Sequence, residues 1–371
     1  MPDTGLTVVG AGVVGLAVAA RLAPRFPDLV VLERRERHGQ ETSSRNSEVV
    51  HAGMYYPTGS LKARLCVQGS RMLYDLCARH DIPHRRITKL IVAATAAEMP
   101  ALEGILAQGR DNGAELRLVT AAECRALEPN VSAMGGLFSP NTGIVSAHGF
   151  MDHLLSAVRA AGGTVQARTE LMGIERRADD YRLTIRMGDE IESFTSERVV
   201  NAAGLEADTV AALAGIDVDA AGYRQHFCKG SYFSVAPARA GVISRLVYPV
   251  PGHVSLGTHA VLGLDGRLRF GPDAEYLPDR ALDYRVDESR RAAFGESVRR
   301  LVPQIRDQDL EPDIAGIRPK LQGPGQGFRD FVIVEESGRG LPGFVNLVGI
   351  DSPGLTSAPA IAEYVGGLLE V

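Results

Sequence analysis

Residues 10–15 carry glycines at the spacing that lets a backbone turn hold a phosphate group. The segment reads GAGVVG and lies between an apolar run and a stretch of small residues. In such a turn Gly10 permits the tight bend, Gly12 lets backbone N–H groups approach a pyrophosphate, and Gly15 lets a helix pack closely on a strand. Glu33 ends the next apolar run, where a carboxylate can accept the hydroxyls of an adenosine ribose. These residues predict a dinucleotide site.

Two further glycine turns indicate FAD rather than NAD. Residues 201–204 read NAAG at the end of a predicted strand, and residues 348–357 place a glycine-rich loop before the last predicted helix. A loop of that kind at a helix N-terminus, far from the first turn, suits the other end of an elongated cofactor. The chain also leaves the regular βαβ repeats of an NAD domain and enters the irregular segment 45–65. We therefore predict FAD, bound noncovalently because no cysteine has an obvious attachment context, and we predict no metal.

Alternating strands and helices would position these turns. Residues 6–9, 12–23 and 29–32 are predicted as strand, helix and strand, the opening of a doubly wound sheet. Residues 60–80 carry the apolar stripe of an amphipathic helix. The other predicted helices cover 98–112, 120–127, 150–161 and 353–369, and the other predicted strands cover 89–93, 164–169, 181–187, 198–200, 227–235, 246–250, 267–270, 331–335 and 344–348.

The order of these elements indicates an α/β (α+β) fold with two interleaved parts. Both ends of the chain have α/β character, whereas apolar and polar residues alternate in the middle as in half-buried antiparallel strands. We predict a Rossmann-like FAD-binding domain with an interleaved, largely antiparallel β-sheet substrate domain. The expected FAD-binding segments are 1–85, 145–215 and 315–371, and the expected substrate-binding segments are 86–144 and 216–314.

Composition and charge exclude several classes of protein. The 371 residues carry a net charge of −5, so we expect no nucleic acid partner and at most a peripheral association with the inner membrane. No apolar run approaches the roughly 18 residues that cross a bilayer. The four cysteines are scattered and form no CxxC pair, so we expect no zinc knuckle and no disulfide framework. This cysteine usage predicts a cytoplasmic protein.

Longer segments resemble the glycine oxidase/D-amino-acid oxidase (DAO) family of flavoproteins, and within it the L-2-hydroxyglutarate dehydrogenases. The likeness extends over nearly the whole chain and includes GAGVVGLAVAARL, VVNAAGLEAD, KGSYFSV and SPGLTSAPAIA. Its most specific part is NSEVVHAGMYYPTGSLKA at 46–63, with KLIVA at 89–93 and RFGPDA at 269–274. The resemblance implies FAD, an interleaved substrate lobe, and oxidation of a small 2-hydroxy acid to the 2-keto acid.

This oxidation needs a hydride acceptor at flavin N5, a base for the hydroxyl proton and cations for the carboxylate. His51 is the leading base candidate, because imidazole titrates near neutral pH and the position matches a family histidine. The alternative is a structural histidine beneath the flavin. His259 matches another family histidine. Arg318 suits a carboxylate clamp, since its planar fork binds bidentately, and a surface salt bridge is the alternative.

A second substrate carboxylate would need a second cation. Lys229, Lys62 and Lys320 are candidates for this cation, although we expect each of them to be exposed. The sequence departs from the family at Arg45, where a histidine is usual, and at Glu48, where a glycine is usual. A charged residue at these two positions would change the charge beside the flavin, which leaves the cofactor prediction intact and bears on the choice of substrate.

Tyrosines are the remaining candidates for substrate contacts. Tyr248 and one of Tyr55 and Tyr56, with Tyr56 preferred, are expected to hydrogen-bond or pack in the site, because neighbours on a strand point to opposite faces. The predicted cofactor contacts are Gly10, Gly12, Val13, Val14, Gly15, Glu33, Arg34, Thr42, Ser43, Arg45, Asn46, Ser47, His51, Ala52, Ala202, Ala203, Gly204, Arg318, Gly349, Pro353, Gly354, Leu355 and Thr356.

Several functions remain compatible with these residues. The favoured one is an FAD-dependent dehydrogenase that converts L-2-hydroxyglutarate to 2-oxoglutarate and passes electrons to a quinone or oxygen. An amine or D-amino-acid oxidase of the glycine/sarcosine type is the alternative, because hydroxy and amino acids present similar groups. A flavin-binding protein without turnover belongs to a different class, and a flavoenzyme of the glycerol-3-phosphate type is a further possibility.

Overall fold

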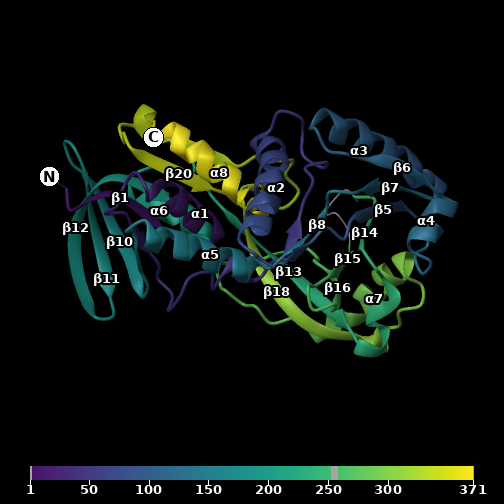
Figure 1. Cartoon of the computed structure of the whole chain (residues 1–371). Helices are drawn as coiled ribbons and strands as arrows, with labels where there is room; N and C mark the ends of the chain where they lie inside the picture. Colours follow the sequence, from purple (N-terminus) through teal and green to yellow (C-terminus); the bar gives the residue numbers. More distant parts are fainter. Residues whose placement is uncertain (1, 252–257, 371) are drawn as a thin grey trace.

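The computed structural model describes residues 2–251 and 258–370 as two large β-sheets surrounded by helices (Figure 1). One part of the molecule holds an eight-stranded sheet and both ends of the chain, and the other holds a nine-stranded sheet. A three-stranded sheet and one long helix lie between these parts. The predicted fold class, a Rossmann-like α/β part with a largely antiparallel second sheet, is confirmed.

The eight-stranded sheet has a parallel centre built from strands far apart in the sequence. Its strands are β1 (Thr4–Val9), β2 (Val30–Leu32), β9 (Thr164–Gln166), β10 (Thr169–Arg176), β11 (Tyr181–Met187), β12 (Glu190–Asn201), β19 (Val332–Glu335) and β20 (Phe344–Val348). Val8 of β1 pairs in parallel with Val31 of β2 and with Val200 of β12. β9 and β20 extend this parallel centre, and β10, β11 and β19 add antiparallel pairs.

Four helices cover the two faces of this sheet. They are α1 (Val13–Leu22), α5 (Ala147–Ala160), α6 (Ala207–Leu213) and α8 (Gly354–Leu368). Val345 and Leu347 of β20 are buried with residues of α1, α5 and α8, whereas their neighbour Phe344 is buried with residues of α6. Because side chains alternate along a strand, α6 lies on the opposite face from the other three helices.

The nine-stranded sheet also buries both of its faces. Its strands are β5 (Lys89–Ala93), β6 (Arg117–Thr120), β7 (Gly135–Ser139), β13 (His226–Val235), β14 (Leu246–Pro249), β15 (His259–Leu262), β16 (Leu268–Gly271), β17 (Glu275–Tyr276) and β18 (Leu310–Lys320), and its helices are α3 (Met99–Asp111), α4 (Ala121–Leu127) and α7 (Arg291–Leu301). In β5, Leu90 and Val92 pack with Phe294 of α7. Ile91 faces the other way and packs with Leu102 of α3.

Helix α2 (Leu61–Arg79) and the small sheet of β3 (Val49–Val50), β4 (His84–Arg85) and β8 (Gly143–Val145) connect the two parts. Ser60 caps α2, because its hydroxyl accepts a hydrogen bond from the backbone N–H of Ala63. α2 packs closely along α8, where a Cβ on Gly69 would lie 2.4 Å from the carbonyl oxygen of Thr356. Among the described residues, no helix is long and apolar enough to span a membrane.

The predicted elements differ from the structure mainly at their ends. α5 begins at Ala147 rather than 150, because the Ser146 hydroxyl caps it by accepting from the N–H of Gly149. β12 covers Glu190–Asn201 rather than 198–200, because its first half carries exposed polar residues that hide the strand pattern. β18 belongs to the nine-stranded sheet over its whole length, so the predicted domain boundary at 315 falls inside one strand.

Gly15 is the tightest point of the β1–α1 unit. A Cβ at this position would lie 2.0 Å from the carbonyl oxygen of Gly10. We therefore expect Gly15→Ala to lower the free energy of unfolding by about 1–3 kcal/mol or more, as overpacking does. Gly104→Ala is the matched control, because it also replaces a glycine within a helix, here α3. A Cβ at position 104 would meet nothing within 4 Å. Urea unfolding of both variants tests this, and equal stability would contradict the packing role of Gly15.

Candidate active site

A cavity of about 480 Å³ lies where β18, β13, α2 and the N-terminus of α8 meet, and a cavity of about 150 Å³ adjoins it between the β1–α1 turn and α6. Volumes of this size suit a small-molecule ligand. The predicted residues in the wall of the larger cavity are Gly12, Val13, Val14, Thr42, Ser43, Arg45, Asn46, Ser47, His51, Tyr55, Tyr56, Lys62, Ala202, Gly204, Tyr248, His259, Arg318, Lys320, Pro353, Gly354, Leu355 and Thr356. Those in the wall of the smaller cavity are Gly10, Gly12, Glu33, Arg34, Thr42, Ser43, Ala202, Ala203 and Gly204.

The turn between β1 and α1 leaves room for a pyrophosphate. Gly10 has a φ of +102°, and a Cβ there would lie 2.5 Å from the carbonyl oxygen of Ala202. A Cβ on Gly12 would meet only the Ser43 hydroxyl, at 3.0 Å, among the described atoms within 4 Å, so this side of the backbone is open. The first turn of α1 forms part of the cavity wall. The two adjoining cavities therefore fit an elongated dinucleotide such as FAD.

Glu33 holds the glycine turn against the end of β2. Its carboxylate accepts hydrogen bonds from the backbone N–H groups of Ala11, at 3.0 Å, and Arg35, at 2.8 Å. Burial raises the pKa of Glu33 above its ordinary value, although both hydrogen bonds oppose this shift. A carboxylate has about four acceptor positions, so it can still accept the ribose hydroxyls of a nucleotide.

We expect Glu33→Gln to weaken FAD binding about 10- to 100-fold, because a neutral amide cannot accept both backbone bonds and loses the charged acceptor. Glu36→Gln is the matched control, since Glu36 is exposed and pairs with the exposed Arg168 at 3.1 Å. Titration of the apoprotein with FAD measures both affinities. Wild-type affinity in Glu33→Gln would contradict the assigned role of Glu33.

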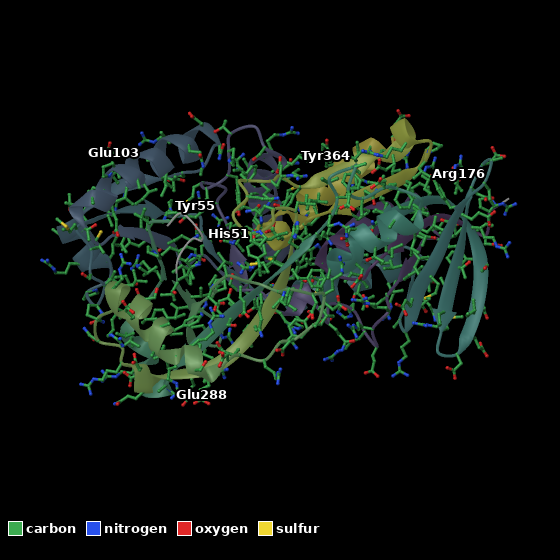
Figure 2. The ribbon with its side chains drawn as sticks, turned by 180° about the vertical axis from the view of Figure 1, so that it is seen from behind. His51, Tyr55, Glu103, Arg176, Glu288 and Tyr364 are labelled. Atoms are coloured by element: carbon green, nitrogen blue, oxygen red, sulfur yellow. The ribbon has the colours of Figure 1, made fainter. Side chains whose placement is uncertain are left out.

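His51 directly follows β3 and lines the larger cavity; Figure 2 labels it near the middle of the molecule. Its backbone N–H donates to the Thr356 hydroxyl at 3.0 Å, which links β3 to the first turn of α8. Burial, followed by the neighbouring Lys89 ammonium, lowers the pKa of the His51 imidazole to about 3. The imidazole is therefore neutral at ordinary pH and has a nitrogen lone pair that can accept a proton, but it is a weaker base than the imidazole titrating near neutral pH on which the prediction depends.

The prediction that only one of Tyr55 and Tyr56 faces the site is wrong. Both side chains are part of the cavity wall, because the two residues lie in a turn rather than on a strand. The Tyr56 hydroxyl lies 3.5 Å from that of Ser352. Tyr248 also lines the cavity, and its ring stacks on the His259 ring with the centroids 3.6 Å apart. Burial raises the pKa of all three phenols, so each is a neutral hydrogen-bond donor.

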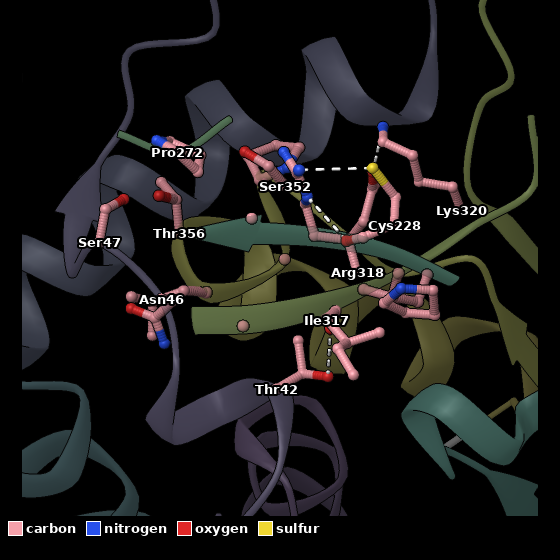
Figure 3. Close-up of a pocket in the computed structure, with 18 of the residues that line it drawn as sticks. Thr42, Asn46, Ser47, Cys228, Pro272, Ile317, Arg318, Lys320, Ser352 and Thr356 are labelled. Atoms are coloured by element: carbon pink, nitrogen blue, oxygen red, sulfur yellow. Dashed lines mark hydrogen bonds and ion pairs between the residues drawn. The ribbon is translucent and has the colours of Figure 1, made fainter. Parts of the chain in front are cut away.

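Arg318 lies beside the cavity and donates hydrogen bonds to backbone carbonyl groups, of which Figure 3 shows that of Cys228. Its guanidinium donates to the carbonyl oxygens of Asp273, at 2.7 Å, Lys229, at 3.2 Å, and Cys228, at 3.3 Å. These acceptors are neutral, so the positive charge of Arg318 is not cancelled by them. A planar cation fixed in this way is preorganised for a carboxylate ligand.

A second cationic group lines the same cavity. Asp351 accepts hydrogen bonds from the ammonium groups of Lys62, at 2.7 Å, and Lys320, at 2.9 Å. Burial alone would raise the pKa of Asp351, but the two ammonium groups outweigh it and lower this pKa. Two cations around one anion leave one positive charge in excess. Lys62 is only 5% exposed, which corrects the expectation of a solvated side chain.

Other predicted residues lie outside both walls, as far as the described chain shows. Gly15 and Ala52 are buried in packing contacts. The N–H of Gly349 donates to the Gln225 side chain at 2.9 Å. Lys229, expected to be exposed, is buried; its backbone carbonyl lies beside Arg318, but its ammonium group lies 3.7 Å from Asp283 and does not line either cavity.

The two departures from the family pattern have different positions. Arg45 lines the larger cavity and stacks over the Tyr284 ring at 4.0 Å. Glu48 adopts a φ of +55°, the region that favours glycine, and its carboxylate accepts from the N–H of Ala147 at 2.9 Å. Glu48 therefore caps α5 and does not line the cavity, which corrects the expectation that it changes the charge beside the cofactor.

Some residues that line the cavity belong to no sequence motif that would identify them as site residues. Asp351 and Tyr232 line the wall without belonging to any predicted set. Gly316 also lines it, and a Cβ there would lie 2.1 Å from the carbonyl oxygen of Arg45. The alternation along β18 offers the one available signal, because Gly316, Arg318 and Lys320 are two residues apart and so share a face. No group of three or more His, Cys, Asp or Glu side chains suited to a metal occurs in the described ranges.

Comparisons with known proteins place these features in context. The family described as FAD dependent oxidoreductase (DAO) matches residues 6–368. The chain is 38% identical to the mitochondrial L-2-hydroxyglutarate dehydrogenase of Arabidopsis thaliana, over 96% of this chain and 82% of that protein. It is 27% identical to the L-2-hydroxyglutarate dehydrogenase of Escherichia coli (strain K12), over 96% and 91% of the two chains. The L-alpha-glycerophosphate oxidase of Mycoplasma pneumoniae, solved with FAD bound, superposes with a TM-score of 0.89 at 26% identity, over 100% and 96% of the chains.

Proposed function

This chain belongs to the DAO family of FAD-dependent oxidoreductases, and from that premise we propose that it oxidises L-2-hydroxyglutarate to 2-oxoglutarate. The full-length likeness to L-2-hydroxyglutarate dehydrogenases supports this substrate. The observation that carries the proposal is the presence of two cationic groups in the lining of one cavity, Arg318 and the Lys62–Asp351–Lys320 cluster. A substrate with two carboxylates needs both of these cations.

The spacing of the cations supports a short dicarboxylic acid. Arg318 and Lys320 are two residues apart on β18, so their Cα atoms lie about 7 Å apart and their side chains leave the same face. We propose that Arg318 binds the carboxylate next to the reacting carbon. Lys320, with Lys62 behind it on Asp351, then attracts the distal carboxylate. A substrate with one carboxylate would leave the excess positive charge of this cluster without a partner.

His51 is the proposed base of the reaction. Bound FAD supplies the acceptor for the hydride that leaves C2 of the substrate. The neutral His51 imidazole accepts the hydroxyl proton, and Arg318 fixes the orientation of C2 by holding the adjacent carboxylate. Tyr55, Tyr56 and Tyr248 donate hydrogen bonds and exclude water from the wall, since burial keeps their hydroxyls protonated.

Anaerobic bleaching of the flavin by a panel of acids tests the substrate class. We expect L-2-hydroxyglutarate to bleach the purified protein, whereas glycine, sarcosine and D-amino acids leave it yellow. Bleaching by the amines alone would replace this proposal with an amine or D-amino-acid oxidase. No bleaching by any acid would favour a flavin-binding protein without turnover. The electron acceptor, a quinone or oxygen, and a cytoplasmic location stay predictions, which dye-linked and oxygen-consumption assays of cell fractions can test.

A further inference from the structure

Lys89 is a buried lysine behind the cavity wall to which the proposed reaction assigns no role. It begins β5 and is 0% exposed. Lys89 and Ile91 share a face of this strand, and Ile91 packs with Tyr248, Ala52 and neighbouring apolar residues. The Lys89 side chain therefore runs into the apolar layer directly behind the wall that carries His51.

The Lys89 ammonium lies among aromatic rings instead of carboxylates. Its Nζ atom is 3.9 Å from the centroid of the Tyr248 ring and 5.5 Å from that of Tyr55. Nζ has no hydrogen-bond partner among residues 2–251 and 258–370. Cation–π contacts recover only part of the hydration that an ammonium loses on burial. This arrangement contrasts with that of Lys62, which is also buried but is bound to Asp351.

Lysine is rare in this chain, which makes the burial of Lys89 more notable. The sequence has 40 basic residues other than histidine, of which four are lysines, at positions 62, 89, 229 and 320. Lys62, Lys89 and Lys229 are buried, and Lys320 is partly buried and bound to Asp351. An unpaired ammonium in an apolar layer costs stability, and a methionine of similar length would fill the same space without this cost. An amine kept under such conditions points to a function.

The groups that face Lys89 carry little compensating charge. The Tyr55 and Tyr248 rings contact the ammonium, the His259 ring stacks on Tyr248, and His51 lines the same cavity as these three residues. The Lys89 charge helps to lower the pKa of His51, and Cys66 of α2 is the other titratable group that interacts with this charge. Burial raises the pKa of the Cys66 thiol to about 12, so this group is neutral. The strand partners of Lys89 are Leu246 and Ser139, which bear no charge. His51 and Lys89 are thus two bases in one poorly solvated layer.

We propose that Lys89 is a positioning residue that acts together with burial to keep the His51 imidazole unprotonated, because a proton taken up by this layer resides on the lysine. The inference rests on the proposed role of His51 as base. Two neighbouring cations in a poorly solvated layer repel each other, so their protonation is coupled and one proton is held at most near neutral pH. The lysine amine is the more basic group, and the histidine is left free to accept the substrate proton.

The charge of Lys89 also has a consequence for stability. Burial lowers the pKa of Lys89 from 10.5 to about 7. Below pH 7 the amine is protonated in both the folded and the unfolded protein, so the cost of burying its charge is fully present. As pH rises from 7 toward 10.5, the folded protein loses this proton before the unfolded chain does. The free energy that burial of the charged amine costs is then no longer lost, so the folded state becomes more stable. The wild type should therefore gain stability relative to Lys89→Met over this range.

NMR of the holoenzyme labelled with ¹³C at lysine Cε measures this protonation directly. The chain has four lysines, so four signals are expected, and Lys89→Met identifies one of them by its loss. We expect the Lys89 signal to titrate more than about two pH units below an ordinary lysine. Titration of this signal above pH 9 would overturn the proposal. The result requires no substrate, so it stands whether or not L-2-hydroxyglutarate is the substrate.

The pH profile of anaerobic flavin bleaching tests the effect on His51. At low pH the bleaching rate falls as His51 takes up a proton. In Lys89→Met we expect this fall to occur at a pH higher by at least about one unit, because loss of a neighbouring positive charge raises a pKa by about that much. Lys89→Arg keeps the charge and should show this fall at the wild-type pH. Leu90→Met is the matched control for a methionine in β5, because Leu90 is buried on the opposite face. A fall at the wild-type pH in Lys89→Met would overturn the proposal, and so would equal shifts in Lys89→Met and Leu90→Met.

Discussion

His51→Ala is expected to keep FAD bound and to slow anaerobic bleaching by L-2-hydroxyglutarate at least about 100-fold, the usual scale of acid–base catalysis. The loss should be confined to chemistry, because the link between β3 and α8 uses the backbone N–H of residue 51, which donates to Thr356. This bond survives the substitution. Stopped-flow absorbance at the flavin maximum gives the rate, and the absorbance of the purified protein gives the FAD content.

His148→Ala is the matched control for this prediction, because His148 is exposed on α5. It should bleach at the wild-type rate. A His51→Ala variant that bleaches as fast as the wild type would remove His51 from the mechanism. A variant that loses FAD would instead identify His51 as a structural histidine beside the cofactor, which is the alternative that its position in the sequence leaves open.

The two cationic groups should be separable by choice of substrate. We expect Arg318→Met to lower kcat/KM about 10³-fold for every 2-hydroxy acid, since losing one partner of a buried charge pair costs about 2–5 kcal/mol. Lys320→Met leaves Asp351 with Lys62 alone and removes the excess positive charge. We expect it to lower kcat/KM about 10- to 100-fold for L-2-hydroxyglutarate and less than about threefold for L-2-hydroxybutyrate, which lacks the distal carboxylate.

Steady-state kinetics on these two substrates measure the difference. The ratio of the two kcat/KM values should fall in Lys320→Met and stay near the wild-type value in Arg318→Met. Equal losses on both substrates in Lys320→Met would show that Lys320 supports the structure rather than the distal carboxylate. Retention of FAD in both variants is the control for folding, because Arg318 also holds three backbone carbonyl groups in place.

Local patterns in the sequence account for the glycine turns that line the two cavities. The glycines at 10–15 act through backbone geometry within a few residues, and their close contacts with Ala202 follow once β1 and β12 pair. Apolar periodicity likewise predicts β5, β11 and β20 with the bounds that the structure has. Such features depend on neighbours in the chain, which a single sequence reveals.

The substrate half depends on contacts between distant residues, which local patterns do not encode. The carbonyl groups that fix Arg318 belong to residues 45 to 90 positions away. The burial of Lys62 results from Asp351, which lies 289 residues away. The prediction for Tyr55 and Tyr56 is wrong because the two residues lie in a turn, where side chains do not alternate between two faces as they do in a strand. Glu48 is also misjudged, since its helix-capping role requires α5 to be in place.

The central claim is that this protein oxidises a dicarboxylic 2-hydroxy acid, and a single anaerobic turnover tests it most directly. Purified protein is mixed with excess L-2-hydroxyglutarate without an electron acceptor, and 2-oxoglutarate is quantified by mass spectrometry against the bleached flavin. We expect one equivalent of 2-oxoglutarate per flavin, and none with glycine or sarcosine. A yellow flavin and no 2-oxoglutarate after mixing with L-2-hydroxyglutarate, together with bleaching by the amines, would contradict the claim.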